Sequence, residues 1–152
     1  MPPALTTASI PVVIVGAGQA GLAMAHALIE RGLNPSEDFI VLDAGNAQTL
    51  SWRRRWDSLR LFTPAWYSHL PGYRMPGPQQ RCPSAKDVAE YLNAYRHNLG
   101  VEPEWGTRAL SVDPQRDGAL MLRTSTGAIR TRTIVAATGP FAVPTYPHFA
   151  DN

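Results

Sequence analysis

The stretch that decides the fold, residues 10–21, reads IPVVIVGAGQAG and joins an apolar run to a glycine-rich turn. Its first half, from Ile10 to Val15, is rich in β-branched residues and continuously apolar, which is typical of a strand buried on both faces of a parallel sheet. From Gln19 to Arg31 apolar residues recur at helical spacing, and Gly32 follows as a stop. The sequence therefore predicts a strand, a tight turn and a helix in succession.

The turn matches the pattern G-x-G-x-x-G, and each of its glycines has a mechanical reason to be there. Gly16 allows the tight turn, Gly18 lets the backbone approach a diphosphate, and Gly21 lets the helix pack closely on the strand. The free N–H groups at the helix N-terminus would hold the phosphates. The alternative interpretation is a glycine-rich turn that binds no ligand.

An acidic residue stands where a dinucleotide-binding fold requires one. A second apolar run, from Phe39 to Leu42, predicts another buried strand, and it ends at Asp43, 22 residues beyond Gly21. At this position a carboxylate accepts hydrogen bonds from the adenosine ribose hydroxyls and disfavours a 2′-phosphate. The alternative is an aspartate that only caps a loop.

Composition limits the kind of protein. The chain has 152 residues, 44% of them hydrophobic and 17% charged, which predicts one globular domain. A formal charge of +2 does not suggest nucleic-acid binding. Cys82 is the single cysteine, so an internal disulfide is excluded and a reducing, cytoplasmic location is favoured. There is no signal peptide pattern and no apolar run near the ~18 residues of a membrane span, so we expect no membrane partner.

The remainder of the chain predicts an α/β fold with an antiparallel insertion. Residues 44–83 show no sustained periodicity, which suggests a long functional loop with one helical turn around 49–56. A capping box at Ser84 opens a helix that runs to Gly100, and a short strand follows near 101–105. Three strands of an antiparallel meander are then expected at 108–112, 120–124 and 128–132, before an apolar strand at 133–138 returns to the central sheet.

Three segments make the chain resemble the N-terminal part of flavin-containing monooxygenases, including plant YUCCA-like and bacterial flavoprotein branches. They are VIVGAGQAGL at 13–22, SWRRRWDSLRLFTP at 51–64, and AATGPF at 136–141 with Pro144 and Pro147 beyond it. NAD-binding and FAD-binding domains share the first segment. A meander followed by an Ala-Thr-Gly turn resembles the FAD domain of flavoproteins that bind two dinucleotides. The expected class is a Rossmann-like FAD-binding domain over 10–152, after a flexible leader at 1–9.

The resemblance implies FAD as cofactor, with 44–83 as a flavin-facing loop. It places Trp52 against the flavin, Thr63 near the isoalloxazine ring and Ala109 near the adenine. The predicted cofactor-binding residues are Gly16, Gly18, Gln19, Ala20, Gly21, Asp43, Ala44, Trp52, Arg53, Thr63, Ala109, Thr138 and Gly139. The asparagine that some members have in the loop near Phe62 is absent here. The usual Gly-Gly before the tryptophan is also missing, and Leu50 and Ser51 replace it.

The implied activity is that of an NADPH- and O₂-dependent oxidoreductase acting on a small organic substrate. The second glycine-rich motif and the signature F-x-G-x-x-x-H of these enzymes do not occur before Asn152, so we expect the NADPH site outside this chain and the chain to be incomplete for turnover. No catalytic residue and no metal site are predicted, and the sequence leaves the oligomeric state open. A different class remains open as well: a non-catalytic nucleotide-binding module or a truncated remnant.

Two features have plainer alternatives. The arginines at 53–55 suit a solvated helical face better than a phosphate or nucleic-acid contact. Trp52 and Trp56, four residues apart, suit a packed core pair as well as they suit flavin contact.

Overall fold

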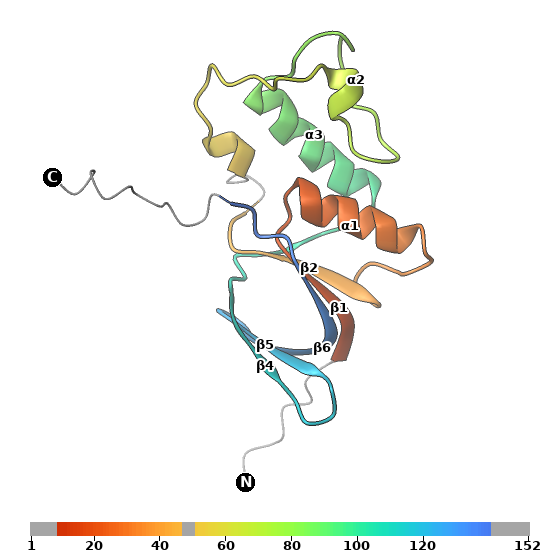
Figure 1. Ribbon diagram of the computed structural model, residues 1–152, viewed down its shortest axis with the longest axis vertical. Coiled ribbons are helices and arrows are strands. Elements are labelled where there is room, and N and C mark those ends of the chain that lie inside the picture. Colours follow the sequence, from red (N-terminus) through yellow and green to blue (C-terminus); the bar gives the residue numbers. More distant parts are fainter. Residues whose placement is uncertain (1–8, 47–50, 141–152) are drawn as a thin grey trace, which may run out of the picture.

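The computed structural model describes residues 9–46 and 51–140 of the chain, and Figure 1 shows its arrangement. Strands and helices alternate at first, and strands dominate the second half. The elements are β1 (Ser9–Val15), α1 (Gln19–Ile29), β2 (Phe39–Asp43), the 3-10 helix η1 (Ser51–Arg54), α2 (Ala65–Ser68), α3 (Ala85–Asn98), β3 (Glu104–Trp105), β4 (Ala109–Pro114), β5 (Leu120–Thr124) and β6 (Gly127–Ala136).

The strands form one six-stranded sheet in the order β3-β2-β1-β6-β5-β4. The pairs β1–β2, β1–β6 and β2–β3 are parallel, whereas β4–β5 and β5–β6 are antiparallel. The predicted fold class is therefore confirmed: a mostly parallel Rossmann-like centre that continues into an antiparallel part. Parallel pairing places the carboxyl ends of β1, β2 and β6 at one edge, where doubly wound folds bind their ligands.

The prediction of two separate strands at 128–132 and 133–138 is wrong. The structure has a single ten-residue strand, β6, over Gly127–Ala136. Its first half pairs with β5 and most of its length pairs with β1, so the third meander strand is also the returning strand of the central sheet. The physical reason is that no glycine, proline or turn residue interrupts the chain between Ile129 and Ala136.

Two apolar clusters hold the layers together. The first lies between the sheet and the helices and includes Ile14, Leu22, Val41, Leu92 and Tyr95. The second lies on the opposite face and contains Val13, Leu42 and Leu122, with partly buried side chains packed around them. Figure 1 shows the helices on one side of β1, β2 and β6 and the β4–β5 hairpin on the other. Both faces of β1 are thus covered, which explains its continuous apolar run.

The segment at 51–83, inside the predicted loop 44–83, is more ordered than its lack of periodicity suggested. The predicted helical turn is confirmed over Ser51–Arg54, while 47–50 lie outside the described residues. A short helix, α2, was not foreseen. Two hydroxyls of α3 hold the part beyond it: Tyr91 donates to the carbonyl of Tyr73 (2.7 Å), and Tyr95 donates to that of Pro71 (2.7 Å).

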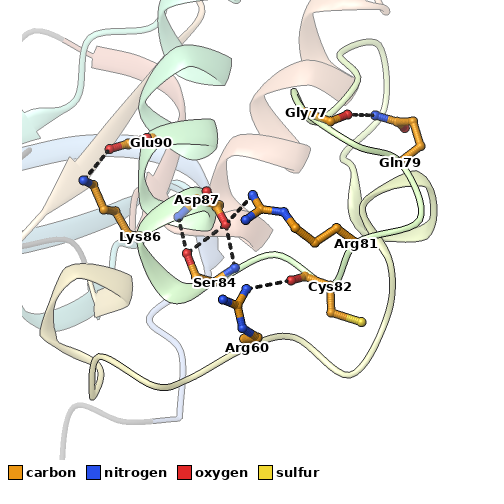
Figure 2. A network of polar contacts seen from close by, with 9 residues as sticks. All are labelled: Arg60, Gly77, Gln79, Arg81, Cys82, Ser84, Lys86, Asp87 and Glu90. Carbon is orange, nitrogen blue, oxygen red and sulfur yellow. Dashed lines mark hydrogen bonds and ion pairs between the residues drawn. The ribbon is translucent and has the colours of Figure 1, made fainter.

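The predicted capping box at the start of α3 is present (Figure 2). Ser84 Oγ accepts from the backbone N–H of Asp87 (3.2 Å), and Asp87 Oδ2 accepts from the backbone N–H of Ser84 (2.8 Å) and from Arg81 (2.9 Å). The backbone N–H of Ser84, with help from the Ser84 hydroxyl and the Arg81 charge, holds the pKa of Asp87 below its ordinary value of 3.8. The ionised carboxylate therefore stabilises the fold.

Asp87→Asn should lower the free energy of unfolding by roughly 0.5–1 kcal/mol near neutral pH, because it removes a negative charge from a helix N-terminus. A carboxyl whose pKa is lowered by folding contributes stability above its unfolded value, and this contribution disappears as the pH falls through the lowered pKa. The difference between wild type and variant should therefore shrink below pH 3.8. Urea unfolding at neutral pH and below pH 3.8 measures this difference, with a substitution at the exposed Glu90, Glu90→Gln, as control. An equal difference at both pH values would contradict the assignment.

Candidate cofactor-binding site

The turn after β1 packs closely against the ends of the neighbouring strands β2 and β6. Gly16 has a φ of +113°, and a Cβ there would overlap the carbonyl oxygen of Ala137 and lie 3.3 Å from the backbone nitrogen of Thr138. Its N–H donates to the carbonyl of Leu42 at 2.7 Å. Only glycine combines this φ with so close a backbone neighbour. The predicted tight turn at Gly16 is confirmed.

The first turn of α1 lies almost directly on the strand. A Cβ at Gly21 would overlap the carbonyl oxygen of Gly16 and lie 3.3 Å from Cγ2 of Ile14. Gly21 is buried, as are Leu22 and Ala25 on the same helix. The predicted reason for this glycine, close packing of helix on sheet, is confirmed.

Gly18 differs from the other two glycines of the turn because the space beside it is open. Its φ of −80° is ordinary for any residue, and a Cβ there would meet nothing within 4 Å. Gly18 is the N-cap of α1 and has no side chain with which to occupy the free N–H groups of the first turn, which also lacks acidic residues. This end of α1 can therefore accept an anion, with room for its oxygen atoms.

Asp43 at the end of β2 braces the turn. Its Oδ2 accepts from the N–H of Ala17 and its Oδ1 from that of Gly45, both at 2.8 Å. The sequence suggested either a ribose-binding or a loop-capping aspartate, and the bond from Gly45 is of the loop-capping kind, whereas the bond from Ala17 across to the glycine-rich turn was missed. An ionised carboxylate has about four acceptor positions, and the two bonds leave capacity for ribose hydroxyls.

The structure brings several predicted residues to the same edge of the sheet. The Ala-Thr-Gly turn directly follows β6 and borders Gly16, since Ala137 donates to the carbonyl of Val15 (2.8 Å). Thr138 and Gly139 are exposed there. Ala44 is exposed just beyond Asp43.

The remaining predicted residues lie in different surroundings. Ala20 is exposed on α1, and Arg53 is exposed on η1. Ala109 begins β4 and packs, partly buried, against the cluster on the far face of the sheet. Its proximity to an adenine stays a prediction.

A cavity of about 280 Å³ opens between the start of α1 and the 51–83 segment. It brings together three predicted residues that are far apart in the sequence, Gln19, Trp52 and Thr63. Its other lining residues are Leu61, Ser68, Leu70, Met75, Val88, Tyr91 and Leu92. The wall is mostly apolar, which suits a flat aromatic ring system.

Trp52 belongs to this cavity rather than to a core pair with Trp56. Trp52 is half-buried, whereas Trp56 is 62% exposed, so the alternative of a packed pair is wrong. The guanidinium of Arg55 lies 6.0 Å from the centre of the Trp52 ring.

The α3 side of the cavity was missed by sequence reasoning. Val88, Tyr91 and Leu92 recur at helical spacing on α3 and are buried in the core, and they also line the cavity. No local signal separates the two roles, because the same stripe serves both. Burial raises the pKa of Tyr91 and raises that of Tyr95 to about 12, so both hydroxyls stay protonated at neutral pH.

The sheet order and the glycine-rich turn together define a Rossmann-like α/β domain of the dinucleotide-binding type. The family model described as pyridine nucleotide-disulphide oxidoreductase matches residues 13–151, and the chain belongs to this family. No helix within the described ranges, 9–46 and 51–140, is long and apolar enough to cross a membrane.

Individual proteins and a solved structure are also similar to the chain over most of its length. The chain is 34% identical over 143 residues to an uncharacterized CzcO-like oxidoreductase of Geobacillus kaustophilus, covering 94% of this chain and 40% of the relative. It is 33% identical to the indole-3-pyruvate monooxygenase YUCCA6 of Arabidopsis thaliana, covering 90% of this chain and 33% of the relative. A flavin-containing monooxygenase from Stenotrophomonas maltophilia superposes with a TM-score of 0.76 at 28% identity, covering 92% of this chain and 41% of that structure.

The resemblance predicted from the sequence is confirmed. The chain corresponds to the FAD-binding part of flavin-containing monooxygenase-like oxidoreductases, a group of enzymes that use FAD and NADPH. It spans about two fifths of the length of the bacterial relatives it matches.

Proposed function

We propose that this chain holds FAD through the residues described above and forms the cofactor-binding part of an NADPH- and O₂-dependent monooxygenase that acts on a small organic substrate in the cytoplasm. The observation that carries the proposal is the contrast within one turn. Gly16 and Gly21 are required by close backbone neighbours, whereas Gly18 borders open space at a helix N-terminus. A turn that served packing alone would not need the third glycine.

Each part of FAD would have its own group of residues. The backbone N–H groups at the start of α1 face the space beside Gly18 and would hold the diphosphate. Asp43 keeps acceptor positions for the adenosine ribose. On the other side of the turn, Gln19 belongs to both α1 and the cavity, so the ring system would lie against Trp52 and Thr63.

When bound, FAD supplies the electron-transfer and oxygen-transfer chemistry of such enzymes. This chain's own residues bind and orient it. The apolar wall formed by Leu61, Leu70 and Met75 limits the access of water to the cavity. Trp52 offers an aromatic face, and the bonds from Asp43 to Ala17 and Gly45 keep the turn in one conformation.

The test is FAD binding by the purified chain. We expect one FAD per chain, measured by its visible absorption after gel filtration and by calorimetry. ADP should compete with FAD because it carries both the adenosine and the diphosphate, whereas adenosine should compete far more weakly. NADPH should leave the bound flavin oxidised, since its site is expected outside this chain. A chain that is folded by circular dichroism and binds neither FAD nor ADP would favour the non-catalytic remnant instead.

A further inference from the structure

Hydroxyl groups make much of the polar part of the cavity wall, and they come from Thr63, Ser68 and Tyr91. A hydroxyl has one proton to donate and two lone pairs that accept. The direction of each existing bond therefore decides what these three hydroxyls can offer to a ligand.

The proton of Tyr91 is already used within the protein. Its O–H donates to the carbonyl of Tyr73 at 2.7 Å, and its oxygen accepts from the N–H of Leu70 at 2.6 Å. The group keeps one lone pair and has no proton to give to a ligand.

The proton of the Ser68 hydroxyl is also used in a bond within the protein. Its Oγ lies 2.8 Å from the carbonyl oxygen of Pro64 and 3.2 Å from that of Thr63. Two oxygen atoms at 2.8 Å repel each other unless a proton lies between them, and a carbonyl has none. Ser68 must therefore donate to Pro64, as serine commonly does to the carbonyl four residues before it.

The direction of the third bond follows. The Oγ atoms of Thr63 and Ser68 are 2.8 Å apart, which also requires a proton between them. Since Ser68 has donated its own to Pro64, Thr63 donates to Ser68. The Thr63 hydroxyl thus keeps both of its lone pairs, and no bond among residues 9–46 and 51–140 uses them.

We propose that this cavity selects a mostly apolar group bearing an N–H or O–H, which donates to the Thr63–Ser68 hydroxyl pair. All three hydroxyls of the wall can accept and none can donate without breaking a bond to the protein. The inference rests on the proposed function, because the cavity is taken as part of the cofactor and substrate region. The donor has two sources, the ring N–H of FAD or a donor group on the substrate.

The experiment compares Thr63→Val, Thr63→Ser and Ser68→Ala with wild type. Valine has the shape of threonine but cannot accept, serine keeps the hydroxyl, and Ser68→Ala frees the Thr63 proton for donation to a ligand. One arm measures FAD affinity. The other measures binding of phenol and of anisole, which differ in one O–H donor, by ligand-observed NMR with and without FAD. Circular dichroism confirms that each variant is folded.

Either of two results supports the proposal. A loss of about fivefold in FAD affinity in Thr63→Val, restored in Thr63→Ser, assigns the donor to the cofactor. The second result is an unchanged FAD affinity together with a weaker preference for phenol over anisole. This preference should fall about fivefold in Thr63→Val and Ser68→Ala but not in Thr63→Ser, which assigns the donor to the substrate.

The proposal is overturned if both quantities match wild type in Thr63→Val and in Ser68→Ala. Should Thr63→Val not fold, Ser68→Ala decides in the same way. If the wild-type chain binds no FAD, the proposed function fails, while the phenol and anisole arm still decides the inference.

Discussion

Gly18→Val will abolish FAD retention while the chain stays folded. A Cβ at this position meets nothing within 4 Å, and valine can adopt the φ of −80°. The substitution therefore causes no steric clash within the protein. The branched side chain would instead occupy the space beside the first turn of α1, where the diphosphate is proposed to lie. Valine is a poorer N-cap than glycine, and we expect a stability cost of only about 1 kcal/mol.

The measurement is flavin content per chain after gel filtration, together with the melting temperature. Ala128→Val is the control, because it also introduces a valine, at an exposed position at the start of β6. The control should keep wild-type flavin content. If Gly18→Val also kept it, the diphosphate would not lie at this turn.

Gly21→Ala will unfold the chain or destabilise it by more than about 3 kcal/mol. The added methyl group would overlap the carbonyl oxygen of Gly16, which is backbone and cannot rotate away, and would lie 3.3 Å from the Ile14 side chain. Relief requires α1 to move off β1, which would open the core that contains Leu22 and Ala25.

Gly18→Ala is the control for this second prediction, since it makes the same chemical change three residues earlier, where a Cβ meets nothing. Its cost should stay below about 1 kcal/mol. Urea unfolding followed by circular dichroism gives both values. Similar stabilities for the two alanine variants would show that the close packing at Gly21 is not needed.

The elements predicted best are those whose signals are local. β1, α1 and β2 agree with prediction to within two residues, because an apolar run, a helical stripe and a stop each lie within a short window. The capping box at Ser84 was foreseen for the same reason. The predictions failed where the information was not local. The lack of a turn residue between Ile129 and Ala136 is compatible with one strand, but only the pairing with β5 and β1 shows that β6 serves both the meander and the central sheet.

The same difference between local and non-local information applies to the candidate site. The sequence by itself determined the turn from Gly16 to Gly21 and the position of Asp43, because the glycine spacing and an acidic residue at the end of the next apolar run are both local patterns. Only the tertiary structure decided that Asp43 braces the turn, that Trp52 and Thr63 meet Gln19 across one cavity, and that its hydroxyls accept. Those properties depend on contacts between residues far apart in the chain and on how each proton is shared, and no short stretch of sequence contains either.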